Sequence, residues 1–297
     1  MFSGSMVALV TPMAADGAID WPAWDRLLDF HVAEGTDGIV VAGTTGESPV
    51  LSATEVEDLT RRAVLRCRDK LKIIVGAGSY ATDATVERTR VLSRLGVDAV
   101  MLVTPYYNKP PQEGLYSHFM AAADASAVPV ILYNVPSRTA VDLLPSTVAR
   151  LARHPRIVAI KEATASLSRA REILDSCPVG FVLLSGDDAT AIDLIGVGAR
   201  GVISVSANVA PRRMHEACGA ALAGDVPQAR AIDATLQPLH KDLFVESNPI
   251  PVKWAVARMG IIGNAIRLPL VELAPAHHET VLRAMRAAGI TLEDQAA

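Results

Sequence analysis

Short apolar runs rich in β-branched residues recur along the chain, and each is followed by a longer amphipathic stretch that carries charges. Gly, Pro, Asn or Asp bound each run, as they commonly bound strands. The repeat of roughly 25 to 30 residues has the length of one strand–helix unit, and eight such units close a barrel with right-handed crossovers. The sequence therefore predicts an α/β fold, a (β/α)8 (TIM) barrel, with strands at 6–10, 38–41, 72–76, 99–103, 130–133, 157–161, 181–185 and 201–204.

Helical patterns lie between the expected strands, and several begin with residues that cap helices. Ser52 and Glu55 have the spacing of a capping box, and Asp187 or Asp188 precedes the pattern that begins at Ala189. The expected helices include 54–68, 82–95, 113–124, 146–153, 167–176 and 189–196.

The strand pattern stops after residue 204, and Ala- and Arg-rich helical patterns follow, broken by Asn-Pro-Ile-Pro at 248–251. A helical cap packed on the barrel is the simple interpretation, because no low-complexity linker separates the two parts. We therefore expect a catalytic barrel at residues 1–210 and a C-terminal helical subdomain at 211–297.

A doubly wound open sheet is the alternative fold. Such a sheet is expected to carry a Gly-rich dinucleotide fingerprint after its first strand, whereas Val10-Thr11-Pro12 stands there in this chain. Half of the residues are hydrophobic and only 4% are aromatic, so the core must consist mainly of Val, Ile, Leu and Ala, as in parallel sheets.

Charge and hydropathy exclude several classes of partner. The formal net charge is -4 and the charges are interspersed, so no basic stripe is available for nucleic-acid phosphates. No apolar run approaches the ~18 residues of a membrane span, and no signal peptide is evident, so we expect a soluble cytoplasmic protein. Cys67, Cys177 and Cys218 are far apart and without metal-site spacing, and we expect reduced, buried thiols.

The most informative residue is Lys161, a single cation at the end of an apolar run. Side chains alternate across a strand, so Lys161 should share a face with Ile157 and Ala159. If that face points into the barrel, burial favours the neutral amine, which can attack a carbonyl. From this segment alone, a lysine that reaches out to solvent remains the alternative.

Other polar residues also stand at the expected C-terminal ends of strands, where barrel enzymes place their active sites. The turn Gly43-Thr44-Thr45-Gly46-Glu47-Ser48 is suited to holding a carboxylate, although an ordinary strand–helix turn would look similar. Tyr133, Thr44 and Tyr107 could transfer protons, or could simply pack. Arg138 could bind a second carboxylate, or could form a surface ion pair.

Metal binding is not expected. Asp187 and Asp188 are adjacent, but helix capping explains them without a metal, and no matching His or Glu cluster accompanies them. The seven histidines receive no catalytic role: 31, 118, 154, 215, 240, 277 and 278.

Several ordered motifs together resemble the dihydrodipicolinate synthase family. They are Gly-Thr-Thr-Gly-Glu at 43–47, Tyr-Tyr-Asn at 106–108, Tyr-Asn-Val-Pro-Ser-Arg-Thr at 133–139, Ile-Lys-Glu-Ala at 160–163 and Ser-Gly-Asp-Asp at 185–188. The likeness extends from Met6 through the Asn-Pro-Ile-Pro-Val-Lys segment at 248–253 and so covers most of the chain.

The resemblance implies a Schiff-base lyase that condenses pyruvate with L-aspartate-4-semialdehyde to 4-hydroxy-tetrahydrodipicolinate, with no metal or organic cofactor. It implies that the catalytic residues are the Schiff-base Lys161 and the proton relay Tyr133, Thr44 and Tyr107. It also implies that substrate is bound by Thr45, Arg138, Gly186 and Ile203. Tyr107 would complete the site of a neighbouring subunit in a homotetramer built from two dimers.

Related alternatives remain open. Sialic acid lyases and keto-deoxy-sugar-acid aldolases share the lysine and tyrosine, but the resemblance to the synthase is favoured by Arg138 and Thr44. A non-enzymatic ligand-binding barrel with an inactive site is disfavoured, because none of the catalytic positions is altered.

The resemblance also bears on feedback inhibition by L-lysine. Ser48 and Tyr106 match positions that bind lysine in sensitive relatives, which use polar or aromatic groups at the positions that are Ala53, Val56, Tyr80 and Ala84 here. Of these, Ala53, Val56 and Ala84 depart from the pattern. Ala84 removes the carboxylate for the ligand's ammonium, although Asp83 or Glu87 could substitute. We therefore expect weak inhibition or none.

Overall fold

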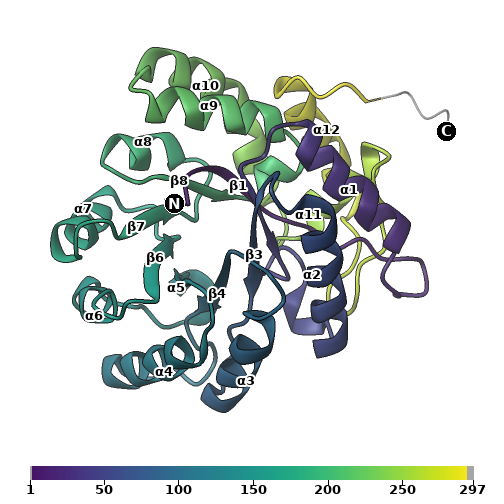
Figure 1. Cartoon of the computed structure of the whole chain (residues 1–297). Helices are drawn as coiled ribbons and strands as arrows, with labels where there is room; N and C mark the ends of the chain where they lie inside the picture. Colours follow the sequence, from purple (N-terminus) through teal and green to yellow (C-terminus); the bar gives the residue numbers. More distant parts are fainter. Residues whose placement is uncertain (1, 293–297) are drawn as a thin grey trace.

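Eight parallel strands form a closed barrel in the computed structural model, which describes residues 2–292 (Figure 1). Each strand pairs with the next along the chain, and β1 pairs with β8 to close the barrel. The predicted (β/α)8 fold is therefore confirmed, and the open sheet is excluded. The strands are β1 (Gly4–Ala8), β2 (Gly38–Val41), β3 (Lys72–Gly76), β4 (Ala99–Val103), β5 (Val130–Asn134), β6 (Ile157–Glu162), β7 (Val182–Ser185) and β8 (Gly201–Ser204).

The first strand lies two residues earlier than the sequence predicted. It begins at Gly4, which pairs with Gly201 of β8, and the assigned strand ends at Ala8. The N–H of Val10 instead donates to Oδ1 of Asn208 at 3.0 Å. The Asn208 side chain, which lies beyond β8, thus replaces a neighbouring strand as the acceptor for the Val10 N–H.

A ring of helices surrounds the barrel (Figure 1). The capping box of Ser52 and Glu55 is present at α2, and Ser166 caps α7. The predicted helices agree with the observed ones to within three residues at each end. From β1 to β8 they are α1 (Trp21–Ala33), α2 (Ala53–Cys67), α3 (Thr82–Leu92), α4 (Gln112–Ala125), the short α5 (Pro136–Thr139), α6 (Pro145–Leu151), α7 (Leu167–Ser176), α8 (Ala191–Gly196) and α9 (Pro211–Leu222).

The sequence offered Asp187 or Asp188 as the cap of α8, and Asp188 does not have this role. Its Oδ2 accepts hydrogen bonds from the N–H groups of Val205 and Ser206, each at 2.9 Å, and so holds the end of β8. Asp187 accepts from the N–H and hydroxyl of Thr190, the residue before α8. Of the two carboxylates, only Asp187 serves the start of this helix.

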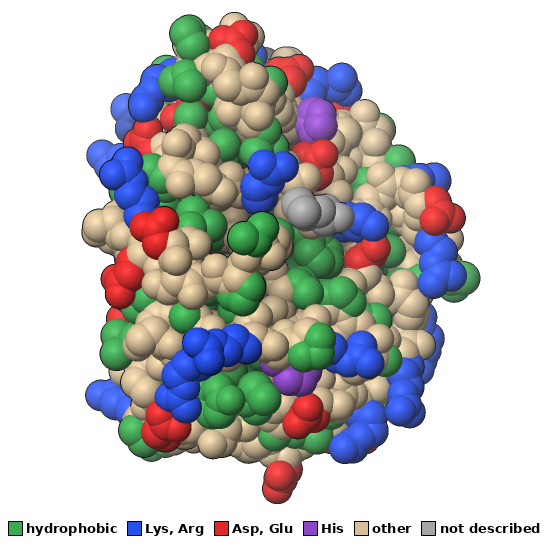
Figure 2. All heavy atoms as spheres, turned by 60° about the vertical axis from the view of Figure 1, so that its left-hand side comes forward, with side chains coloured by type: hydrophobic (Ala, Val, Ile, Leu, Met, Phe, Trp, Pro, Cys, Tyr) green, Lys and Arg blue, Asp and Glu red, His purple; other side chains and the backbone are tan. Residues whose placement is uncertain are grey.

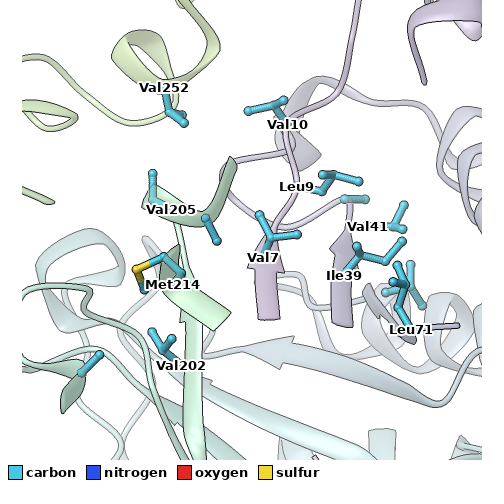
Figure 3. Close-up of a cluster of buried hydrophobic side chains, with 14 of the residues drawn as sticks. Val7, Leu9, Val10, Ile39, Val41, Leu71, Val202, Val205, Met214 and Val252 are labelled. Atoms are coloured by element: carbon cyan, nitrogen blue, oxygen red, sulfur yellow. The ribbon is translucent and has the colours of Figure 1, made fainter. Parts of the chain in front are cut away.

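Two apolar layers follow from the alternation of side chains along each strand. An inner cluster fills the barrel, and Met6, Val40, Ile131 and Leu184 belong to it. The outer cluster packs the strands against the helices, as Figure 3 shows for Val7 and Ile39 on neighbouring strands and for Met214 of α9.

A register shift between β5 and β6 interrupts this alternation. Val130 pairs with Ile157 and Ile131 with Ala159, so Val158 is an extra residue on β6. Ala159 therefore lies in the inner cluster, while Ile157 belongs to the outer one. The expectation that Ile157 shares the face of Lys161 is wrong for this reason.

Three further helices follow the ring: α10 (Val226–Asp242), α11 (Ile250–Arg258) and α12 (His278–Ala287). α10 packs on α9 and on α12, whereas α9 itself packs on β1 and so belongs to the ring. A division of the chain at residue 210 stays a prediction. No helix in the described part of the chain is long and apolar enough to cross a membrane.

Surface charges of both signs are interspersed on the face that Figure 2 shows. The cysteines form no disulfide. Cys67 and Cys218 are buried as expected, but Cys177 is only half-buried, because it lies at the C-terminal end of α7. Burial raises the pKa of the Cys67 and Cys177 thiols to about 11, so both resist ionisation near neutral pH.

Closure of the barrel generates the first prediction. A Cβ on Gly201 would lie 2.1 Å from the carbonyl oxygen of Gly4, and its φ of +154° disfavours other residues. Gly201→Ala should therefore lower the free energy of unfolding by about 2–4 kcal/mol, measured by denaturant unfolding followed by circular dichroism. Gly219→Ala is the control, since nothing lies within 4 Å of that Cβ in α9, and it should be neutral or stabilising by about 1 kcal/mol.

Candidate active site

Lys161 lies at the C-terminal end of β6 and points into the barrel, where only 4% of it is exposed. It pairs in register with Tyr133 on β5, and its Nζ lies 4.4 Å from the centroid of the Tyr133 ring. The Lys161 amine forms no ion pair or hydrogen bond with any residue that the structure describes. The structure therefore presents a buried amine that is not held by a carboxylate.

Glu162, the next residue, lies on the opposite face of β6. Its carboxylate accepts a hydrogen bond from Arg169 of α7 at 3.0 Å and another from Asn134 at 3.1 Å. Arg169 also pairs with Asp142. This network compensates the charge of Glu162 on the outer face of β6. Although Glu162 is next to Lys161 in sequence, its carboxylate therefore does not pair with the Lys161 amine.

Gly186 lies against Lys161 after β7. A Cβ at this position would lie 3.1 Å from Cε of Lys161 and 2.7 Å from Cβ of Ala163. The N–H of Gly186 donates to the carbonyl of Glu162 at 2.8 Å, which fixes the backbone beside the lysine. Glycine at 186 therefore avoids a clash with the Ala163 side chain and a tight contact with Lys161, a reason that the sequence alone could not supply.

The turn after β2 carries a concentration of N–H groups. Hydrogen bonds from Gly46 and Ser48 to the carbonyl of Gly43, and from Glu47 to that of Thr44, close it at 3.1 to 3.2 Å. The N–H groups of Thr44 and Thr45 donate to no acceptor within residues 2–292. Unsatisfied N–H groups of this kind can hold a carboxylate.

Asn248 joins two candidate substrate-binding residues. Its Nδ2 donates to Oγ1 of Thr45 at 3.0 Å, and its carbonyl accepts from Nη2 of Arg138 at 3.2 Å. Because the Thr45 oxygen already accepts this bond, its own proton remains available for another acceptor. Asn248 is not among the site residues predicted from the sequence, although the break at 248–251 marked its position.

Tyr107 lies apart from the other candidate residues. It is 90% exposed and has a φ of +75°, an uncommon conformation for a tyrosine. Thr44 and Tyr133 line one cavity, but no hydrogen bond in the described chain joins the hydroxyls of Thr44, Tyr133 and Tyr107. A single chain therefore assembles only part of the predicted proton relay.

The cavity that reaches Tyr133 has a volume of about 280 Å³ and continues outward between α2 and α3. Thr44, Gly76 and Met101 lie near its barrel end, and Glu57, Glu87 and Arg88 line its helical end. Ile203 belongs to the inner cluster together with Tyr133.

No group of three His, Cys, Asp or Glu side chains within the described residues is placed to hold a metal ion. The histidines are not part of the Lys161 site. His31 and His118 are buried, and desolvation lowers their pKa values to about 3 and about 4, so both are neutral near pH 7.

The arrangement suits one kind of ligand. The buried amine of Lys161 lies against Tyr133, which lines a cavity together with Thr44 of the turn. The N–H groups of this turn and the Thr45 hydroxyl can bind a carboxylate, and Asn248 joins Thr45 to a second cationic group, Arg138. A 2-oxo acid could place its carboxylate on the turn and its ketone at the amine, which is the geometry needed for an imine to form.

Comparisons with known proteins agree with this chemistry. Residues 1–288 match the Dihydrodipicolinate synthetase family. The 4-hydroxy-tetrahydrodipicolinate synthase of Stutzerimonas stutzeri is 53% identical over 290 residues, covering 98% of this chain and 99% of that protein. The synthase of Nitrosomonas eutropha is 54% identical over 292 residues, covering 98% and 100%. A crystal structure of the chloride-inhibited dihydrodipicolinate synthase from Acinetobacter baumannii, complexed with pyruvate, matches with a TM-score of 0.96 at 46% identity, covering 98% of this chain and 100% of that one.

Proposed function

The chain belongs to the dihydrodipicolinate synthetase family, and on that premise we propose that Lys161 forms the Schiff base with pyruvate. The chain is a lyase that condenses pyruvate with L-aspartate-4-semialdehyde to 4-hydroxy-tetrahydrodipicolinate, in the biosynthesis of diaminopimelate and lysine. The observation that carries the assignment of Lys161 is its buried amine, which lies against Tyr133 and has no carboxylate partner among residues 2–292.

The amine attacks C2 of pyruvate, and loss of water gives the imine. Removal of a C3 proton then gives an enamine, whose C3 attacks the aldehyde carbon of the second substrate. The amino group of that substrate finally displaces Lys161 from C2 and closes the ring. Each step moves a proton, so hydroxyl groups near Lys161 are needed. The candidates are Tyr133, against whose ring the amine lies, and Thr44, which lines one cavity with Tyr133.

Two sites for carboxylates account for the two substrates. The free N–H groups of Thr44 and Thr45, with the Thr45 hydroxyl, would hold the pyruvate carboxylate. Arg138, oriented by the carbonyl of Asn248, would bind the semialdehyde carboxylate. Gly186 and Ile203 would contribute backbone oxygens beside the pocket. A separate cationic group for a second carboxylate favours the synthase over the aldolases of sugar acids, because the semialdehyde brings a carboxylate of its own.

Tyr107 supports an assembly of several chains. Its exposed side chain and its positive φ favour a role that only a partner subunit completes. We propose a homotetramer built from two dimers in which Tyr107 of each chain completes the relay of its neighbour. A cytoplasmic location belongs to the same proposal, since both substrates are soluble metabolites.

Weak inhibition by L-lysine stays a prediction. Ser48, Ala53 and Val56 line the cavity described above. The side chains of Ala53 and Val56 offer no hydrogen-bonding groups to a ligand there. Glu87, one of the two residues that could substitute for the missing acceptor, also lines it.

Borohydride reduction tests the Schiff base. In the presence of pyruvate it should add one pyruvyl group to Lys161, because only an imine is reduced to a stable adduct. Intact-mass measurement and peptide mapping locate the adduct. The other buried lysine, Lys253, is bonded to Glu47 and should stay unmodified; an adduct on Lys253 with Lys161 intact would refute the assignment.

Arg138→Ala tests the second substrate site. Loss of the charged contact should reduce the stabilisation of the transition state by about 2–4 kcal/mol. This corresponds to a decrease in kcat/KM for the semialdehyde of roughly 30-fold to 1,000-fold. Borohydride trapping of pyruvate should persist at close to the wild-type rate. Equal losses in trapping and in turnover would show that Arg138 supports the fold rather than the second substrate.

Mixing an impaired variant with an inactive one tests the shared relay. Tyr107→Phe should lower turnover by about tenfold or more, and Lys161→Ala should abolish it. When the two are refolded or co-expressed together, mixed dimers contain one site with an intact lysine and an intact Tyr107 from the partner, so activity should return. Failure of the mixture to recover activity, although mixed dimers form, would place Tyr107 in its own subunit's site.

A further inference from the structure

A buried ion pair lies behind the turn that would hold the pyruvate carboxylate. Lys253 of α11 binds Oε1 of Glu47, and the two residues are only 1% exposed each. They are separated by 206 positions in the chain. Neither residue lines the described cavity, so the pair is not placed to touch substrate there.

Glu47 is held on its second oxygen as well. Its Oε2 accepts from the N–H of Arg267 at 3.1 Å. The Arg267 guanidinium donates to the carbonyls of Val50 at 2.7 Å and Gly17 at 2.9 Å, and it also pairs with Glu55 at the start of α2. The segment that follows the turn is therefore fixed from the same side as Glu47.

The backbone of Glu47 requires this support. Its φ of +59° and ψ of +32° are left-handed, which costs free energy for a residue other than glycine. The hydrogen bond from its N–H to the carbonyl of Thr44, and that from the Thr11 hydroxyl to the carbonyl of Gly46, depend on this conformation. In the same turn, the N–H groups of Thr44 and Thr45 have no acceptors in the described chain.

α11 is anchored firmly enough to serve as the fixed end of the pair. Figure 3 shows Val252, the neighbour of Lys253, in the apolar cluster that also contains Val10 and Val205. Lys253 is thus carried by a packed helix, whereas Glu47 belongs to a turn. Desolvation lowers the pKa of Lys253, and the adjacent Glu47 carboxylate opposes this effect. The Glu47 carboxylate thus favours the charged form of Lys253.

We propose that the Lys253–Glu47 ion pair positions the carboxylate-binding turn, so that the N–H groups of Thr44 and Thr45 are set for pyruvate before it binds. This inference rests on the proposed function. Lys253 and Glu47 are positioning residues, because they act through the backbone of the turn. The pair should therefore affect the use of pyruvate more than that of the semialdehyde, whose carboxylate lies at Arg138.

The test compares Lys253→Met with Lys72→Met. Lys72 pairs with Asp98 at 2.8 Å at the start of β3, so the control removes a lysine ion pair at the opposite end of the barrel. Lys253→Met should raise KM for pyruvate by about tenfold or more and leave KM for the semialdehyde within about twofold, since small displacements of binding groups have large kinetic effects. Lys72→Met should change neither. A folded Lys253→Met enzyme with wild-type KM for pyruvate would overturn the proposal.

The double variant Lys253→Met with Glu47→Gln separates positioning from charge. Lys253→Met alone leaves a buried carboxylate that could repel pyruvate, and the double variant removes this charge. Positioning predicts that KM for pyruvate stays raised in the double variant; a return to the wild-type value would mean that the pair only neutralises charge and would overturn the proposal.

Glu47→Gln serves where Lys253→Met does not fold. It should raise KM for pyruvate by about threefold or more, with the semialdehyde unaffected, because glutamine keeps the size of the side chain but loses the ionic bond. Equal changes for both substrates would contradict positioning.

Borohydride trapping of the wild type is the separate readout for the proposed function. If pyruvate and borohydride do not trap the wild type, the proposed function fails. If the wild type is trapped and the variants have unaltered KM values, only the ion-pair inference is refuted.

Discussion

Closure of the parallel sheet is the constraint on which the rest of this structure depends. Because β1 hydrogen bonds to β8, every strand has two neighbours and the C-terminal ends of all eight strands meet around one opening. Side chains that alternate along each strand must then point either into the barrel or toward the helices. Lys161 and Glu162, adjacent in sequence, consequently reach different environments: the amine lies against Tyr133, and the carboxylate lies against Arg169.

Burial alone does not make a lysine reactive, as the two buried lysines of this chain demonstrate. Lys253 is enclosed and bonded to Glu47, so its charge is compensated and its amine is occupied. Lys161 is buried beside an aromatic ring and has no partner within the described residues. The difference lies in the disposition of carboxylates: one is supplied to Lys253, while the one nearest to Lys161 in sequence is bound behind its strand.

The chain segment that follows the barrel contributes to the candidate site as well as to the fold. Asn248 connects Thr45 with Arg138, and Lys253 and Arg267 both hold Glu47. Loops at the mouth of a barrel gain precision when packed elements hold them, because each added contact removes conformations that would misplace a binding group. The C-terminal segment thus contacts the turn after β2 from outside the ring of strands, through Thr45 and Glu47.

The sequence by itself determined the barrel and marked the candidate site residues. Periodicity and turn residues predicted all eight strands, and a lone cation that ends an apolar run marked Lys161, because alternation and burial are local properties of a strand. Local patterns could not reveal the extra residue on β6 that moves Ile157 outward, since it arises from the register with β5. Nor could they pair Glu47 with Lys253 or join Asn248 to Thr45, or show why residue 186 must be glycine. Only the tertiary structure decided these contacts, because their energies depend on distances between segments far apart in the chain and on removal of water from both partners.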